Sequence, residues 1–299
     1  MTTRPPKPEW LKVRAPGGER YNFIKGRMRE LGLATVCEEA RCPNVAECWG
    51  GGTATIMVMG DTCTRGCRFC AVKTNRNGRP IDPEEPRKVA EMVTQLDLEY
   101  IVVTSVDRDD LPDQGASHFA QCVHELKQRQ PDLLVEILIG DFRGEAELIR
   151  VISESGADVI AHNIETVERL TPSVRDPRAK YRQSLEVLRT IKAQASNVVT
   201  KSSIMVGLGE TPEEVTQALR DLRAVECDIV TFGQYLQPTA KHLPVVEFVT
   251  PEQFKAYQQE AEAMGFRYVA SGPLVRSSYR AGELFVKGMI EERRAPVHT

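Results

Sequence analysis

The chain has 299 residues, of which 41% are hydrophobic and 27% charged, and its formal net charge is −3. This length and composition predict one large α/β domain or two small ones. The weakly acidic balance argues against a general affinity for nucleic acid, and no run of about 20 apolar residues predicts a membrane span. Because the N-terminus also lacks the apolar core of a signal peptide, we expect a soluble, cytoplasmic protein.

The first 52 residues form a predicted N-terminal extension, which is rich in Pro and Gly and has little periodicity. Its one predicted helix lies around Phe23–Leu33. Three cysteines follow this helix with the spacing CxxxxCxxxxxC, namely Cys37, Cys42 and Cys48. We assign residues 1–52 to a separate part of the molecule that carries these thiols.

A regular alternation of strands and helices predicts a core at residues 53–265. Apolar, β-branched runs predict six buried strands, at Thr53–Met59, Tyr100–Val106, Leu133–Gly140, Asp158–Ile164, Val198–Val206 and Asp228–Tyr235. Helical patterns fill the gaps, at Arg87–Leu96, Ala116–Arg129, Glu145–Ser155, Tyr181–Ala193 and Glu213–Val225. Six successive βα units are too few for the usual eight-stranded barrel. We therefore expect an α/β fold with a parallel, partial (β/α)6 barrel, whose chemistry lies at the C-terminal strand ends.

Residues 266–299 are the predicted C-terminal extension. A helix at Pro251–Met264 leads into it through a short apolar run, Phe266–Ala270. The sequence VRSSYRAGE follows at residues 275–283. Taken alone, this polar stretch predicts only a surface loop, because Arg and Ser are usually exposed.

A second group of cysteines, Cys63, Cys67 and Cys70, has the spacing CxxxCxxC and begins just after the first predicted strand. Cysteine-rich intracellular chains bind metal more often than they form disulfides. Structural zinc normally takes four protein ligands, and no fourth cysteine or histidine lies near this loop. Three thiolates instead predict an iron–sulfur cluster that leaves one iron open. The upstream triplet is one ligand short in the same way, so we expect two cluster sites.

The CxxxCxxC group after the first strand of a partial barrel resembles the signature of radical S-adenosylmethionine enzymes. The resemblance implies a 4Fe-4S cluster whose open iron binds S-adenosylmethionine and helps to cleave it to a 5′-deoxyadenosyl radical. It implies further cofactor contacts by position, at Phe69, Ser105, Asn163, Glu165 and Met205. Arg178 and Lys201 lie near the predicted rim, where either could neutralise the methionine carboxylate or orient the substrate.

The upstream cysteines make the resemblance more specific. CxxxxCxxxxxC shortly before CxxxCxxC resembles the pattern of lipoyl synthases, and residues 275–283 resemble the RSSY motif of that family. By position, the match implies Ser278 as the fourth ligand of an auxiliary 4Fe-4S cluster, with Ser277 as the alternative. The resemblance continues through SVDRDDLPDQGA (105–116), HNIET (162–166), GLGE (207–210) and GQYLQP (233–238), and so covers nearly the whole chain.

This resemblance implies a sulfurtransferase that inserts two sulfur atoms, at carbons 6 and 8 of a protein-bound N6-octanoyl-lysine, to give the lipoyl cofactor. In lipoyl synthases the auxiliary cluster is the sacrificial sulfur donor. A serine oxygen is a poorer match for cluster iron than a thiolate, so the iron that it binds should be the easiest to lose. The implied partners are an octanoylated lipoyl carrier protein or lipoyl domain, an electron donor such as flavodoxin or ferredoxin, and an iron–sulfur carrier that rebuilds the cluster.

Two other interpretations stay open. Another sulfur-inserting radical enzyme would share the second cysteine group, although biotin synthases lack the upstream triplet and methylthiotransferases carry an RNA-binding domain that is not evident here. A zinc-stabilised, non-catalytic protein would be colourless. Two 4Fe-4S clusters would instead give a brown protein with about eight irons.

Overall fold

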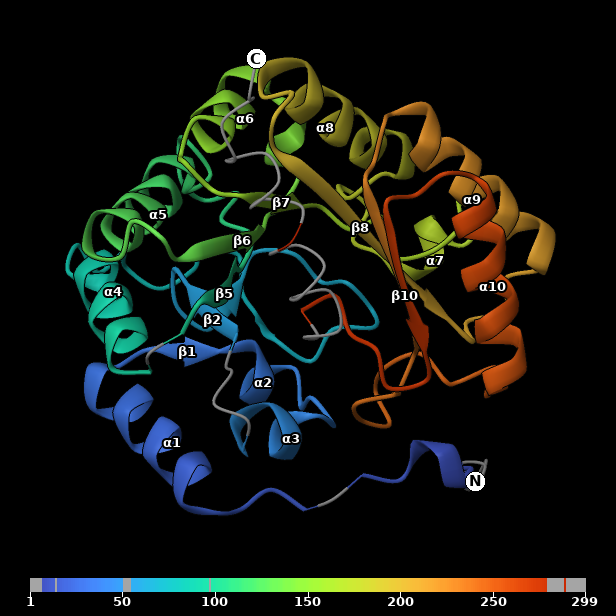
Figure 1. Cartoon of the computed structure of the whole chain (residues 1–299), viewed down its shortest axis with the longest axis horizontal. Coiled ribbons are helices and arrows are strands. Elements are labelled where there is room, and N and C mark those ends of the chain that lie inside the picture. The colour runs from blue at the N-terminus through green and yellow to red at the C-terminus, as the bar shows by residue number, and fades with distance from the viewer. Residues whose placement is uncertain (1–6, 14, 51–54, 97, 279–287, 289–299) are drawn as a thin grey trace.

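The computed structural model describes residues 7–13, 15–50, 55–96, 98–278 and 288 (Figure 1). Its main feature is one sheet with the strand order β1-β2-β5-β6-β7-β8-β9-β10. The strands from β2 onward pair in parallel, and they are β2 (Thr55–Val58), β5 (Tyr100–Ser105), β6 (Leu134–Leu138), β7 (Val159–Ala161), β8 (Val199–Val206), β9 (Ile229–Gln234) and β10 (Tyr268–Gly272). In the described part of the chain, β1 (Ala34–Thr35) and β10 stand at opposite ends of this order and do not pair with each other.

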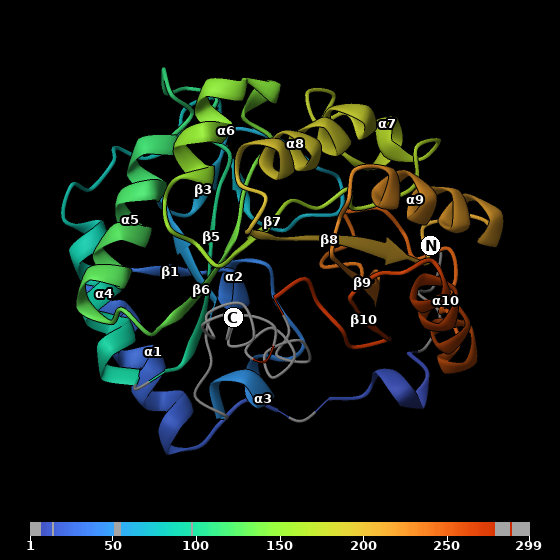
Figure 2. The same ribbon diagram turned by 45° about the horizontal axis from the view of Figure 1, so that its top comes forward.

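Helices cover the outer face of the curved sheet (Figures 1 and 2). They are α4 (Glu85–Leu96), α5 (Ala116–Arg129), α6 (Ala146–Ser153), α8 (Tyr181–Gln194), α9 (Pro212–Ala224) and α10 (Pro251–Ala263). The ends of α9 follow from its sequence, because Thr211 and Glu214 form a capping box and a proline opens the first turn. Val215, Leu219 and Leu222 line the buried face of this helix.

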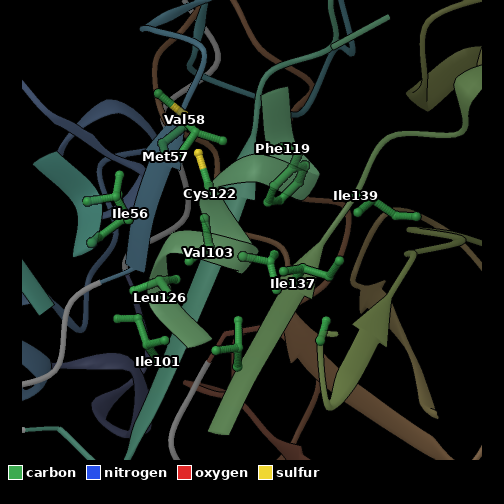
Figure 3. Close-up of a cluster of buried hydrophobic side chains, with 14 of the residues drawn as sticks. Ile56, Met57, Val58, Ile101, Val103, Phe119, Cys122, Leu126, Ile137 and Ile139 are labelled. Atoms are coloured by element: carbon green, nitrogen blue, oxygen red, sulfur yellow. The ribbon is translucent and has the colours of Figure 1, made fainter. Parts of the chain in front are cut away.

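The largest apolar core lies between the first strands and the helices outside them (Figure 3). All four residues of β2 and the first five residues of β5 are buried. Strands that are covered on both faces are uniformly apolar rather than alternating, which is the pattern of a parallel α/β sheet. Figure 3 shows Phe119, Cys122 and Leu126 of α5 among the side chains of this core.

Shorter elements complete the described structure. They are η1 (Glu9–Leu11), α1 (Glu19–Leu31), α2 (Val36–Glu39), α3 (Val45–Gly50), a small parallel sheet of β3 (Thr62–Cys63) and β4 (Lys73–Thr74), η2 (Phe142–Gly144) and α7 (Thr171–Val174). None of the helices within the described ranges combines the length and the apolar run that a membrane crossing requires.

The predicted α/β fold with a parallel, partial barrel is confirmed, and the structure adds β10, which pairs with β9. The prediction of six βα units left this strand out because it assigned the short apolar run Phe266–Ala270 to the C-terminal extension, whereas its last residues form part of β10. The division into parts 1–52, 53–265 and 266–299 stays a prediction. The sheet itself continues beyond residue 265, to Gly272.

Two similar ion pairs lie at the N-terminal end of the barrel strands. In each, a lysine in the last turn of a helix pairs with an aspartate that directly precedes a strand: Lys127 of α5 with Asp158, and Lys192 of α8 with Asp228. Each lysine also donates to a loop carbonyl, and each aspartate accepts a backbone N–H from the neighbouring strand. The charges that stabilise the barrel at this end are therefore separate from the opposite rim, where the cysteine loop lies.

Candidate metal centres

The loop from Thr62 to Cys70, here called the cysteine loop, lies across the C-terminal ends of the strands. The Cys63 sulfur is 3.7 Å from Asp107 Oδ2, and Cys67 Sγ accepts a hydrogen bond from the backbone N–H of Asp176, at 3.3 Å. After burial, which is the main cause, the charge of Cys70 also raises the pKa of both Cys63 and Cys67. The three predicted ligands therefore share one electrostatic neighbourhood.

Burial raises the pKa of the Cys63 and Cys67 thiols to about 12 and that of Cys70 to about 11. Thiols in such surroundings stay protonated near neutral pH unless a metal ion or cluster displaces the protons. Three free, partly buried thiols on one short loop fit a cluster better than they fit a nucleophile. In this respect the geometry suits the predicted 4Fe-4S cluster.

Arg65, within the cysteine loop, ties the loop to neighbouring carboxylates. Its side chain is 2% exposed, and it donates to Asp109 Oδ2 at 2.9 Å and to Asp141 Oδ2 at 2.6 Å. Burial alone would raise the pKa of Asp141, but the hydrogen bond and charge of Arg65 hold that pKa below its usual value. On the other side of the loop, Asp176 Oδ2 accepts the backbone N–H of Gly66, at 2.9 Å. The loop conformation thus depends on buried ion pairs.

Phe69 and Met205, which we predict to lie beside the adenine, come together in the structure. Both pack against a small apolar cluster that contains Val174, Leu208 and Tyr235. Met205 belongs to β8, and Phe69 precedes the third cysteine of the loop. An apolar surface directly beside the cluster ligands is suited to the face of a purine.

Asn163 and Glu165 also form a pair, directly after β7. Asn163 Nδ2 donates to Glu165 Oε1 at 3.1 Å, and Glu165 has a left-handed backbone with φ of 66°. The buried Oδ1 atom of Asn163 has no partner among the described residues. An unpaired buried acceptor beside a carboxylate fits a ligand that brings hydroxyl donors, such as a ribose. Ser105 lies at the C-terminal end of β5, opposite Val58, as expected for a rim residue.

Arg175 is a candidate ligand-binding residue that the sequence did not reveal. It is 7% exposed and donates to Ser184 Oγ at 2.8 Å, while its buried Nε has no partner among the described residues. Its positive charge lowers the pKa of Cys67 and of Glu165, partly offsetting the larger effect of burial. A buried guanidinium with an unpaired N–H at this position fits the carboxylate of a bound amino acid. Basic residues are common in the chain, so sequence alone carries no signal for this one.

The two basic residues that the sequence suggested have other roles. Lys201 is buried and pairs with Glu136 Oε1 at 2.6 Å, so its charge is used inside the barrel. Arg178 Nε donates to Asp176 Oδ1 at 2.8 Å, and its guanidinium also reaches the Thr64 carbonyl oxygen, at 2.7 Å. Arg178 therefore supports the cysteine loop. Because Lys201 already has a countercharge in Glu136, the structure favours Arg175 over it for a carboxylate ligand, and the suggestion that Lys201 binds one stays a prediction.

Two of the upstream cysteines lie on short helices, and the third lies between them. Cys37 is buried in α2, Cys48 lies in α3, and the backbone N–H of Cys42 donates to the Cys37 carbonyl oxygen at 3.0 Å. Burial and then the nearby Cys37 charge raise the pKa of Cys42. All eight cysteines lie within the described residues, and no disulfide joins any two of them.

The C-terminal serine motif reaches these upstream cysteines. Asn44, which is 3% exposed, donates from Nδ2 to the carbonyl oxygen of Leu274 at 2.6 Å. The charge of the partly exposed Arg276 lowers the pKa of Cys42, partly offsetting the larger effect of burial. Ser278 and its alternative Ser277 follow directly and are partly exposed. A fourth ligand from this segment is consistent with the contacts around it, and the choice of Ser278 stays a prediction.

Among the described residues, Glu85, His118 and Cys122 bring potential ligand atoms within 4.8 Å of one another, and none of the three belongs to a cysteine triplet. Glu85 Oε2 already accepts from the backbone N–H of Met59 at 2.8 Å and from His118 Nε2 at 2.7 Å, and Cys122 is fully buried in the core. Beside them, a side chain at Gly115 would collide with Met59, since an added Cβ would lie 2.1 Å from its Sδ. This group therefore anchors the end of β2 to α4 and α5.

Similarity to a known family and to solved structures first defines the class of protein. A model described as the radical SAM superfamily matches residues 57–222. A crystal structure of methylornithine synthase has a TM-score of 0.55 at 16% identity and covers 85% of this chain and 83% of its own. SuiB from Streptococcus suis, bound to S-adenosylmethionine, has a TM-score of 0.56 at 8% identity over 77% of this chain and 54% of its own. The protein is a member of the radical S-adenosylmethionine superfamily.

Closer relatives define the family. A model of the N-terminal domain of lipoyl synthase matches residues 2–42. Lipoyl synthase from Anaeromyxobacter dehalogenans is 60% identical over 290 residues, which are 97% of this chain and 98% of the relative. Mitochondrial lipoyl synthase from Branchiostoma floridae is 59% identical over 292 residues, covering 96% of this chain and 78% of the relative. The chain belongs to the lipoyl synthase family.

Proposed function

We propose that the protein is a lipoyl synthase that inserts sulfur at carbons 6 and 8 of an octanoyl-lysine on a lipoyl carrier protein or lipoyl domain. The observation that carries the proposal is the hydrogen bond from Asn44, which lies between Cys42 and Cys48 in the sequence, to Leu274 of the C-terminal segment. This contact supports a second cluster site, beyond the site that defines the superfamily. Family membership favours this reaction over those of other sulfur-inserting radical enzymes.

Each candidate residue has a role in this proposal. Cys63, Cys67 and Cys70 would hold the radical cluster, which with S-adenosylmethionine supplies the hydrogen-abstracting radical when both are bound. Phe69 and Met205 would flank the adenine, Asn163 and Glu165 would accept hydrogen bonds from the ribose hydroxyls, and Ser105 would accept one from the methionine amino group. Arg175 would pair with the methionine carboxylate. The apolar side chains around the loop would exclude water from the radical.

The second site is proposed to be the sulfur source. Cys37, Cys42, Cys48 and Ser278 would hold the auxiliary 4Fe-4S cluster, giving two clusters in all. Serine provides an oxygen ligand, which matches iron of a cluster less well than sulfur does. Ser278 would therefore hold its iron less tightly than the cysteines would hold theirs. Turnover would require an iron–sulfur carrier for rebuilding and an electron donor such as flavodoxin or ferredoxin.

The proposed location is the cytoplasm. Lipoyl synthases from two Anaeromyxobacter strains, which are bacterial, are covered over 98% and 99% of their length. The relatives from Branchiostoma floridae and Phaeodactylum tricornutum are named mitochondrial. Fractionation of the source cells would test this part of the proposal.

The activity is tested with anaerobically reconstituted protein, S-adenosylmethionine, a strong reductant and an octanoylated lipoyl-domain peptide. We expect a peptide that carries two new thiols, detected by mass spectrometry, and a loss of iron and sulfide from the protein. Iron and sulfide analysis before the reaction should show about eight of each. Cleavage of S-adenosylmethionine without sulfur insertion, at full cluster loading, would contradict the proposed substrate.

A further inference from the structure

Residues 234–243, here called the connecting segment, begin at the C-terminal end of β9 and contact both the cysteine loop and the C-terminal segment that carries the serine motif. The segment has no regular secondary structure after Gln234 apart from a turn. In Figure 2 it lies near the barrel rim, where β9 and β10 end. Its contacts join parts of the chain that are far apart in sequence.

At one end, the connecting segment binds the cysteine loop. His242 Nε2 lies 2.9 Å from the carbonyl oxygen of Cys70, and the backbone N–H of Leu243 donates to the carbonyl oxygen of Arg68 at 3.3 Å. Because a carbonyl oxygen can only accept, Nε2 carries the proton, and Nδ1 accepts from the Thr239 hydroxyl at 2.8 Å. The two bonds to the loop flank Phe69 on either side.

The connecting segment is also fixed internally. The hydroxyl of Tyr235, a 2% exposed residue, donates to the Leu243 carbonyl oxygen at 2.8 Å. Gln237 Nε2 donates to the His242 carbonyl oxygen, also at 2.8 Å. Gln234 is itself held on both sides, since its Nε2 donates to Glu247 O at 2.9 Å and its Oε1 accepts a backbone N–H at 2.8 Å. A displacement at His242 would therefore be transmitted to the end of β9.

At its other end, the connecting segment meets the C-terminal segment that carries the serine motif. The carbonyl oxygen of Gln234 accepts from Arg276 at 3.4 Å. The two backbones are in direct contact, because an added Cβ at Gly233 would lie 2.1 Å from the Val275 carbonyl oxygen. In the same segment, the Leu274 carbonyl oxygen accepts from Asn44 Nδ2 at 2.6 Å, and Asn44 lies between Cys42 and Cys48 in the sequence. A path of contacts thus leads from Cys70 to Asn44, among the upstream cysteines.

We propose that the connecting segment fixes the separation of the two cluster sites and that His242 is the positioning residue at its radical-cluster end. The inference rests on the proposed function, in which a substrate radical made at one site must reach sulfide at the other. A misplacement of about 1 Å can cost a factor of about 100 in the rate of such a step. Loss of the His242 contact should therefore reduce sulfur insertion more than cleavage of S-adenosylmethionine.

The test compares His242→Ala with His242→Gln, whose amide nitrogen can replace the Nε2 donor, in protein loaded with both clusters. The ratio of 5′-deoxyadenosine to dithiol product should rise about tenfold in His242→Ala, while 5′-deoxyadenosine itself changes less than about twofold. His242→Gln should stay within about twofold of the wild type in both quantities. An unchanged ratio, or an equal fall of both products, would overturn the proposal.

A second measurement does not depend on activity. Pulsed electron paramagnetic resonance on the reduced, doubly loaded protein reports the magnetic coupling between the two clusters, and His242→Ala should broaden its distribution. Tyr235→Phe, which removes the hydroxyl bond to Leu243, should act in the same direction and covers the case in which His242→Ala fails to fold. Coupling identical to the wild type in the folded variants would overturn the proposal. Absence of dithiol product with wild-type protein would instead contradict the proposed function and leave this comparison intact.

Discussion

His162, which directly precedes the predicted cofactor contact Asn163, has a structural role. It is 3% exposed, its Nδ1–H donates to the Ile139 carbonyl oxygen at 3.0 Å, and its Nε2 accepts from the Ser184 hydroxyl at 2.9 Å. Burial, followed by the nearby Arg175 charge, lowers its pKa to about 4. Both ring nitrogens are occupied, so His162 is a structural residue, as a lone histidine in a strand-end motif usually is.

This lowered pKa predicts a pH dependence of stability. The neutral ring is favoured in the folded state, so its full contribution is present above the unfolded pKa of about 6.5 and is lost as the pH falls toward 4. The loss should reach about 3 kcal/mol near pH 4. His162→Asn, which keeps an N–H donor but does not titrate there, should show a flatter curve. Chemical unfolding between pH 4.5 and 7 measures this, and parallel curves would contradict it.

The two cysteine groups predict separable defects. Cys63→Ala should abolish cleavage of S-adenosylmethionine, because the radical cluster loses one of its ligands. Cys37→Ala should leave cleavage largely intact and eliminate sulfur insertion, because only the proposed sulfur source is lost. Assays of 5′-deoxyadenosine and of the dithiol peptide distinguish the two variants. Equal loss of both products in Cys37→Ala, at full loading of the radical cluster, would show that the sites do not have separate roles.

At the scale of elements, the strands and helices were predictable because their apolar patterns are local. The ends of these strands and helices were less predictable. We predicted a strand at Asp158–Ile164, but β7 covers only Val159–Ala161, since the Asp158 side chain is used in an ion pair and Glu165 adopts a left-handed backbone. These departures depend on partners elsewhere in the chain, namely Lys127 and Asn163. A sequence pattern does not contain them.

The ion pairs at the N-terminal end of the barrel give a prediction about stability. Lys192→Met should lower the free energy of unfolding by about 3 kcal/mol, because Asp228, whose side chain is 10% exposed, would lose its nearer countercharge and keep only Arg267, at 3.8 Å. Arg189→Met on the same helix is the matched control. It removes an ion pair with Glu186 that is more than half exposed on both sides, so its effect should stay below about 1 kcal/mol. Similar losses in the two variants would contradict this account.

For the whole molecule, the buried Asn44 predicts a defect confined to one cluster. Asn44→Ala removes the bond to Leu274, across 230 residues of chain, and should loosen the C-terminal segment that supplies the proposed fourth ligand. Iron content should fall from about eight toward about four per chain, with cleavage of S-adenosylmethionine retained. Asn75→Ala, at an exposed position, is the control. Iron analysis and the 5′-deoxyadenosine assay measure the effect, and unchanged loading would argue against this link.

The candidate site could be predicted only in part. Residues that are close together in the sequence could be found from it, and residues that act through distant contacts could not. The cysteines are found from their spacing because each triplet lies within a short segment. Arg175, Asn44 and His242 act through contacts with residues more than 100 positions away or through an unpaired buried atom. No local pattern reports such a contact. These residues therefore became candidates only with the three-dimensional structure.

The antiparallel strand β1 has a consequence for experiments on the intact enzyme. It pairs Ala34 with Met57 and Thr35 with Ile56, so it covers the outer edge of β2. Trp49, fully buried in the same N-terminal part, belongs to the main core. Uncovered sheet edges and core surfaces promote self-association. A truncation before β2 would consequently produce an aggregating fragment rather than a working radical generator, and single-residue substitutions are the means of studying one half of the chemistry without the other.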